Sequence, residues 1–208
     1  MRSLVAFAVA LGAASSLGVA AATTATRDST PARPPSHVVR AGADFQRVGD
    51  FWVRRDPTYR GALAAFGRAS ACRLVARSTR VADAVWRTLG VRVRLATLGA
   101  LGAGETACSD PARVWINVIT VSGRDWRTSR GLRIGDSRAR VLRLYPRASY
   151  HRRGGLGPAR SWWLVTGRDP CIGSRCGARR RVSVPRLAAR MRAGRVASFV
   201  LPVRAQGD

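Results

Sequence analysis

The sequence contains no lysine, a single glutamate and two histidines, so few residues are available for common catalytic arrangements. Glu105 lies in a Gly-rich stretch close to Asp110, where solvated loop acids are expected rather than a paired-carboxylate site. A Ser-His-Asp or Cys-His device would have to use His151, because His37 falls in a Pro-rich segment. Two arginines follow His151 and oppose a protonated imidazole, and no nucleophile motif accompanies it. The sequence therefore predicts a protein that is not an enzyme and that has no cofactor.

Acidic residues are scarce, at 11 against 37 basic residues, and every basic residue is arginine. Codon bias in a GC-rich genome explains the missing lysine but not the shortage of acids. The net charge of +26 predicts attraction to polyanions with a strong dependence on salt. The arginines are scattered, the densest run being 179–181, so no segment has the pattern of a base-reading element and no specific nucleic acid is expected. The expected partner is an acidic extracellular or envelope protein or, alternatively, an anionic wall polymer or lipid.

Long apolar runs are missing after residue 22. Residues 1–22 carry one positive charge, then an apolar stretch of small residues that ends in three alanines, which is typical of a secretory signal peptide cut near Ala22. The most apolar part, residues 4–11, is far shorter than the ~20 residues of a membrane-spanning helix. Residues 23–40 are rich in Pro, Thr and Ser, which predicts a disordered linker. We expect a secreted, extracellular or cell-wall-associated protein without a transmembrane anchor in the mature chain.

An internal repeat is visible in two related pentads. Residues 66–70 read Phe-Gly-Arg-Ala-Ser and residues 145–149 read Tyr-Pro-Arg-Ala-Ser, 79 positions apart. A short amphipathic helix is predicted before the first pentad, with Asp56 as N-cap and Pro57 at the first position. The apolar face of that helix consists of Tyr59, Leu63 and Phe66.

The second predicted helix has Asp136 or Ser137 as N-cap, and Pro146 ends it. Its buried stripe is expected to consist of Val141, Leu142 and Tyr145. Matching caps and helices before the two pentads favour a duplication over a chance match of five residues.

Strand patterns follow each helix. After the first helix they lie at residues 72–76, 84–86, 91–95 and 114–121, and after the second at 161–166, 181–184, 187–191 and 196–201. The last two are joined across Ala193-Gly194, which predicts a hairpin. The predicted fold is therefore α+β, with two tandem repeats at 41–127 and 128–208. Each repeat is a short helical element packed on an antiparallel meander.

Four cysteines, an even number in an exported chain, predict two disulfides. Three connectivities are open, and Cys72–Cys108 with Cys171–Cys176 is favoured because each pair then stays inside one half of the chain. The alternative for Cys171 and Cys176 is a metal knuckle, but no second pair and no histidine lies nearby at ligand spacing. No metal site is predicted.

The segment Thr-Ser-Arg-Gly-Leu-Arg-Ile-Gly-Asp-Ser at 128–137, followed by Val-Leu-Arg-Leu-Tyr-Pro at 141–146, resembles a known family. It is similar to the Gly-apolar-x-x-Gly-Asp-Ser turn and helix of the β-lactamase-inhibitor-protein-like superfamily. That superfamily also includes the small lipoprotein of the outer-membrane β-barrel assembly machinery. The resemblance implies helices packed on an antiparallel sheet, a tandem duplication with a disulfide in each copy, and extracellular protein binding as a class of function. It assigns no residue of this chain as a binding contact.

Six tryptophans are present, and two of them are adjacent. In a strand, Trp162 and Trp163 point to opposite faces, so both faces need cover. One possibility is that one indole is exposed and ringed by Arg160 and Arg168, which is the composition of a protein-binding hot spot. The other is that one indole packs under the helix and its neighbour under the adjoining repeat. These four residues are the candidate protein-binding site.

Overall fold

The computed structural model describes residues 36–75, 78–97, 99, 102, 104–153, 157–170 and 181–203. All of them belong to the unit Pro34–Asp208. The predicted signal peptide, the predicted linker as far as residue 35, and Cys171 with Cys176 lie outside the described residues. No helix in the described part of the chain is long and apolar enough to cross a membrane.

The described residues form a mixed α+β fold that is mostly β-sheet. The helices are α1 (Tyr59–Phe66) and α2 (Arg138–Leu144). The strands are β1 (Val38–Ala41), β2 (Gln46–Val48), β3 (Phe51–Trp52), β4 (Ala71–Leu74), β5 (Val81–Trp86), β6 (Val91–Thr97), β7 (Val114–Val121), β8 (Arg127–Thr128), β9 (Ser149–His151), β10 (Ser161–Pro170), β11 (Arg181–Arg192) and β12 (Arg195–Pro202).

Eight strands form one large antiparallel sheet in the order β4-β5-β6-β7-β12-β11-β10-β9. Alternate residues of its strands face the main hydrophobic core, as in β6, where Val91, Val93 and Leu95 are buried and the arginines between them are exposed. The predicted strand 114–121 coincides with β7. The two strands predicted at 181–184 and 187–191 are a single strand, β11, in which Pro185 pairs with Thr166 of β10 and lies before the part of β11 that pairs with β12.

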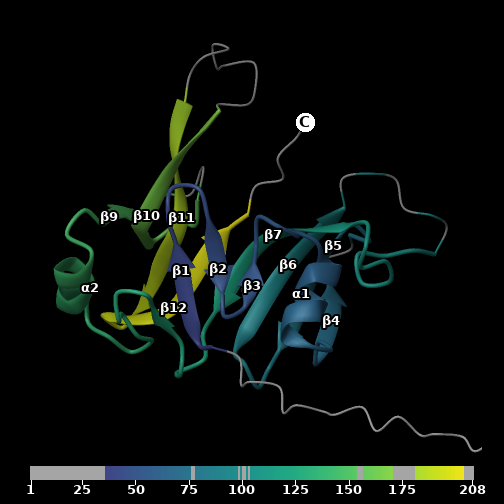
Figure 1. The fold of residues 1–208 in the computed structure, drawn as a ribbon, viewed down its shortest axis with the longest axis horizontal. Helices are drawn as coiled ribbons and strands as arrows, with labels where there is room; N and C mark the ends of the chain where they lie inside the picture. The colour runs from purple at the N-terminus through teal and green to yellow at the C-terminus, as the bar shows by residue number, and fades with distance from the viewer. Residues whose placement is uncertain are drawn as a thin grey trace, which may run out of the picture. The chain divides into compact units, whose positions relative to one another are not determined.

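A second, four-stranded sheet has the order β3-β2-β1-β8. In Figure 1 its strands β1, β2 and β3 cross in front of the large sheet. Its inner face buries Val39, Val48 and Phe51 in the core shared with the large sheet. The prediction of a linker up to residue 40 was therefore wrong at its C-terminal end, because the apolar side chain of Val39 is fully buried in β1.

Helix α1 begins two positions later than the predicted cap implied. The Thr58 hydroxyl accepts a hydrogen bond from the Gly61 N–H, so Thr58 is the N-cap, and Asp56 accepts from the Thr58 N–H. Tyr59 is buried, and Phe66 contacts Trp86 edge to face with a ring separation of 5.4 Å. The predicted apolar face therefore packs on β5.

Helix α2 begins after Ser137, whose hydroxyl accepts from the Arg140 N–H, and ends at Leu144. Val141 and Tyr145 are buried as expected, whereas Leu142 is 37% exposed, so its assignment to the buried stripe was wrong. Positions i and i+4 of a helix share a face, and the residue after i is turned about 100° away from it.

Two local predictions are confirmed. Cys72 in β4 forms a disulfide with Cys108. Ala193 and Gly194 join β11 to β12 with positive φ angles of 48° and 75°, as expected for the two central residues of a tight hairpin turn.

Candidate functional site

Trp162 and Trp163 are both buried, at 8% and 7% exposure, so of the two alternatives the one with an exposed indole as a binding anchor is wrong. The ring of Trp162 lies under the Arg138 guanidinium, 5.1 Å from the ring centre, and contacts the Tyr150 ring at 5.5 Å. The structure thus supports the alternative in which helix α2 covers one indole. Arg160 and Arg168 are exposed on either end of β10, apart from any exposed tryptophan.

On the other face of β10, the Trp163 ring stacks on His151 at a centroid distance of 3.5 Å. The Trp163 Nε1 is buried and has no hydrogen-bond partner among the described residues. His151 Nε2 lies 2.9 Å from the Ser149 hydroxyl, but this pair is exposed on the edge strand β9. None of the hydrogen bonds or ion pairs found in the described regions joins His151 to a carboxylate. Within the described residues, this exposed Ser–His pair therefore has no orienting carboxylate of the kind found in a Ser-His-Asp triad.

The outer face of the small sheet brings together side chains that are far apart in the sequence. Arg47 in β2 lies between two partners in the sheet. On one side it is opposite Trp52 in β3, and on the other side it is opposite Arg40 in β1. On the same face, Val38 in β1 lies beside Arg127 in β8. Because side chains alternate along a strand, this face is opposite to the buried one and points to solvent. We define the outer face by these five residues.

One end of the outer face is aromatic. The guanidinium carbons of Arg47 and Arg55 lie 5.1 Å and 4.8 Å from the centre of the Trp52 ring. The Phe45 ring lies 6.3 Å from that of Trp52 and is 41% exposed. One of the alternatives for Trp162 and Trp163 was an exposed tryptophan ringed by arginines. A related arrangement, a half-buried tryptophan flanked by two arginines, is found at Trp52.

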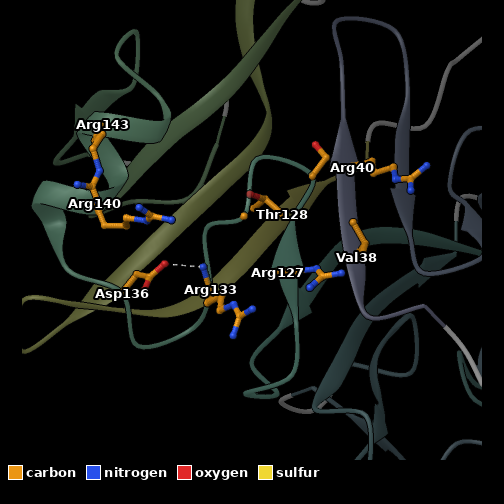
Figure 2. Close-up of a pocket in the computed structure, with 10 residues that line it drawn as sticks. Val38, Arg40, Arg127, Thr128, Arg133, Asp136, Arg140 and Arg143 are labelled. Atoms are coloured by element: carbon orange, nitrogen blue, oxygen red, sulfur yellow. Dashed lines mark hydrogen bonds between the residues drawn. The ribbon is translucent and has the colours of Figure 1, made fainter.

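The other end of the outer face opens into a groove of about 730 Å³. Its arginines come from three elements and one turn: β1, β8, the turn before α2, and α2 itself (Figure 2). The lining residues are Val38, Arg40, Arg127, Thr128, Ser129, Gly131, Arg133, Asp136, Arg140 and Arg143. We call this cavity the arginine groove.

The floor of the arginine groove is fixed by buried polar contacts. The Thr128 hydroxyl accepts a hydrogen bond from the Leu132 N–H at 3.2 Å. The Arg130 guanidinium lies over the ring of Tyr145, the residue that caps α2, 5.0 Å from the ring centre. Burial raises the pKa of Tyr145, while the Thr128 side chain and the nearby Arg130 charge act in the opposite direction.

The charges of the arginine groove are poorly balanced. Five arginines face a single carboxylate, Asp136, which accepts a hydrogen bond from the Arg133 backbone N–H at 2.8 Å (Figure 2). None of the five takes part in the ion pairs found among the described residues, which join Arg47–Asp50, Arg94–Asp83, Arg113–Glu105, Arg113–Asp110 and Arg186–Asp169. Like charges held in one cavity repel each other, so this lining favours the binding of an anion.

A buried network fastens the small sheet to the large one. Arg186 in β11 forms an ion pair with Asp169, and its Nε donates to the Ala43 carbonyl in the β1–β2 turn at 2.9 Å. The Gln46 side-chain amide donates to the Arg186 carbonyl at 2.7 Å and to the Pro202 carbonyl at 3.0 Å. The outer face is therefore carried on a rigid support.

Sequence reasoning missed both ends of the outer face, because their residues converge only through strands of two to four residues. The one available signal was the density of arginine around α2, with four in the segment 138–147. Among the described residues, no group of three histidine, cysteine, aspartate or glutamate side chains could hold a metal ion. In comparisons with known proteins, no protein-family model, no curated protein and no solved structure matches this chain.

Proposed function

We propose that the protein is an exported binding protein, not an enzyme, that recognises an acidic extracellular or envelope protein through the outer face of its small sheet. The observation that carries this proposal is the half-buried Trp52 flanked by Arg47 and Arg55, with the exposed Phe45 ring beside it. Tryptophan and arginine are the residues most enriched among the energetic centres of protein interfaces. Sheet residues also present such anchors more rigidly than loop residues do.

The anchor is held in place before a partner arrives. Arg47 donates from Nε to the Gly49 carbonyl at 2.8 Å and pairs with the Asp50 carboxylate at 2.9 Å. Because this side chain is already ordered, binding costs less conformational entropy than it would with a free arginine. The net charge of +26 would speed the encounter with an acidic partner and oppose encounters with other basic proteins.

Export is supported by the first 22 residues and by the Cys72–Cys108 disulfide, a bond that persists in oxidising compartments. It remains a proposal, and the mass of the mature protein recovered from the culture medium or the cell envelope would test it. A chain that retains residues 1–22 and free thiols inside the cell would contradict it.

The two-repeat architecture is part of the same proposal. Helix α1 precedes strands β4 to β7, helix α2 precedes β9 to β12, and the large sheet reads β4-β5-β6-β7 against β12-β11-β10-β9. Each related pentad runs from the end of a helix to the outermost strand of its half. These features support a tandem duplication of the kind that the resemblance to the β-lactamase-inhibitor-protein-like superfamily implies.

A pull-down with the mature, oxidised protein as bait tests the proposed partner. Three baits would be compared: the wild type, the Trp52→Ala variant and the Leu74→Ala variant. Secreted and envelope fractions would be applied to each bait at low and at high salt. Leu74 is a matched control, since it is an exposed apolar residue of strand β4, at 42% exposure.

We expect one acidic protein to be retained at high salt by the wild type and by Leu74→Ala but not by Trp52→Ala. Loss of a hot-spot side chain typically lowers the binding free energy by about 2 kcal/mol, so the Trp52→Ala variant should have a roughly 30-fold larger dissociation constant. This constant would be measured afterwards with the purified partner. Retention of wall polymer or lipid alone, and only at low salt, would overturn the proposal. Equal retention by Trp52→Ala would overturn the assignment of the outer face.

A further inference from the structure

We propose that the arginine groove is a binding site for a chain of phosphodiester groups linked by small polyol units. This site can be tested apart from the proposed protein partner, because Trp52, Arg47 and Arg55 do not line the groove, although Val38, Arg40 and Arg127 belong both to the outer face and to the groove lining. The charge of the lining indicates the first property of the ligand. Five arginines and one aspartate give the groove a formal charge of +4, so the ligand must bring several negative charges into about 730 Å³.

Hydrogen-bonding capacity distinguishes phosphate esters from acidic peptides. A guanidinium group donates five hydrogen bonds and accepts none, so the lining offers many donors. Its side-chain acceptors are fewer: the Asp136 carboxylate and the hydroxyls of Thr128 and Ser129. Of these, Asp136 already accepts from the Arg133 N–H and Thr128 from the Leu132 N–H. Phosphodiester oxygens accept only, whereas every peptide unit adds an N–H that needs an acceptor. Arginine also matches phosphate geometry by bidentate contacts.

The lining also indicates which class of phosphate-containing molecule fits the groove. No aromatic side chain lines the groove, whereas proteins that hold single-stranded nucleic acid usually stack bases on aromatic rings. Val38 is the one large apolar residue in the lining, so the acyl chains of a phospholipid would have little to pack against. A chain of phosphodiesters joined by short polyols carries neither bases nor acyl chains, and therefore fits this lining best.

Isothermal titration of the mature, oxidised protein with a poly(glycerol phosphate) oligomer tests the site. The test variant is Arg140→Gln with Arg143→Gln, which removes two groove charges from the exposed side of α2. The control variant is Arg68→Gln with Arg87→Gln, which removes two exposed charges outside the groove lining. Circular dichroism and thermal unfolding of both variants would establish that each is folded.

The salt dependence gives the expected magnitude. If all five arginines contact phosphates, the slope of log K against log salt is about −3.5, taking the value of roughly 0.7 per contact known for single strands. The Arg140/Arg143 variant keeps three groove arginines, so its slope is expected near −2. We expect that variant to bind at least tenfold more weakly, and the control variant to stay within about twofold of the wild type.

Four results would overturn the inference. Equal weakening of the control variant would mean that bulk charge, not the groove, binds the polymer. Polyglutamate of matched charge binding as tightly would contradict the selection of phosphate over carboxylate. Tighter binding of an oligothymidylate, or of vesicles containing anionic phospholipid, would assign the groove to nucleic acid or to lipid. Because Trp52→Ala leaves the groove intact, that variant is expected to bind the polymer like the wild type, which separates this test from that of the protein partner.

Discussion

Removal of the Cys72–Cys108 disulfide is expected to lower the free energy of unfolding by about 4 kcal/mol. The bond joins residues 36 positions apart, and the loop-closure entropy of such a loop amounts to about 13 cal/mol/K, or roughly 3.8 kcal/mol at 25 °C. Cys72 lies in β4, an edge strand paired only with β5, and the bond fastens it to the connection between β6 and β7. For a chain of this size, the loss corresponds to a melting temperature lower by roughly 8–15 °C.

The assay is urea unfolding followed by tryptophan fluorescence. A background variant with Cys171→Ala and Cys176→Ala keeps only Cys72 and Cys108. Three samples would be compared: this variant oxidised, the same variant reduced, and the variant that also carries Cys72→Ala and Cys108→Ala. Under the loop-entropy account, the reduced form and the alanine variant are destabilised by similar amounts. A loss below about 1 kcal/mol in both would refute the reasoning. A large loss in the alanine variant alone would assign the effect to packing of the half-buried sulfurs.

Two further predictions concern the buried polar groups. Arg186→Met removes the guanidinium that pairs with the Asp169 carboxylate and is expected to cost about 3 kcal/mol in urea unfolding. Arg186→Met combined with Asp169→Leu should cost less than the sum of the single changes, and additive losses would contradict a direct pairing. Burial raises the pKa of Tyr59 above its usual 10.0, so its contribution to stability is complete below pH 10 and falls as the pH rises towards the folded-state pKa. Tyr59→Phe should therefore flatten the decline of unfolding free energy between pH 9.5 and 11, and Tyr150→Phe, which alters an exposed residue, should not.

The elements that could be predicted from the sequence are those with local patterns. Strand β6 alternates buried apolar residues with exposed arginines from Val91 to Leu95, and the turn at Ala193-Gly194 is short and Gly-containing. Helix α2 was predicted with Ser137 as one of two possible caps. Each of these signals lies within about ten residues and is independent of what the element packs against.

The small sheet could not be predicted in this way. Strand β1 has four residues and β3 has two, too few for a period to be recognised. The parallel pairing of β1 with β8 joins Val38 to Arg127, 89 positions away in the sequence. Likewise, the exposure of one indole or another is decided by tertiary packing: Trp162 is covered by α2, and Trp52 lies on a short outer strand. The combination of a tryptophan with flanking arginines could be expected from the composition, but its location at Trp52 could not.

The charge of this protein makes the design of binding experiments decisive. With 37 arginines and 11 acids, any polyanion will adhere to some degree at low salt, and a weak interaction measured there carries no information about a site. What distinguishes the arginine groove is that five arginines line one cavity and that none of them forms an ion pair with a described residue. Replacing Arg140 and Arg143 in α2 removes two charges from the groove, whereas replacing Arg68 and Arg87 lowers the net charge by the same amount and leaves the groove lining unchanged. A difference in salt slope between charge-matched variants is therefore the measurement that separates a binding site from a basic surface.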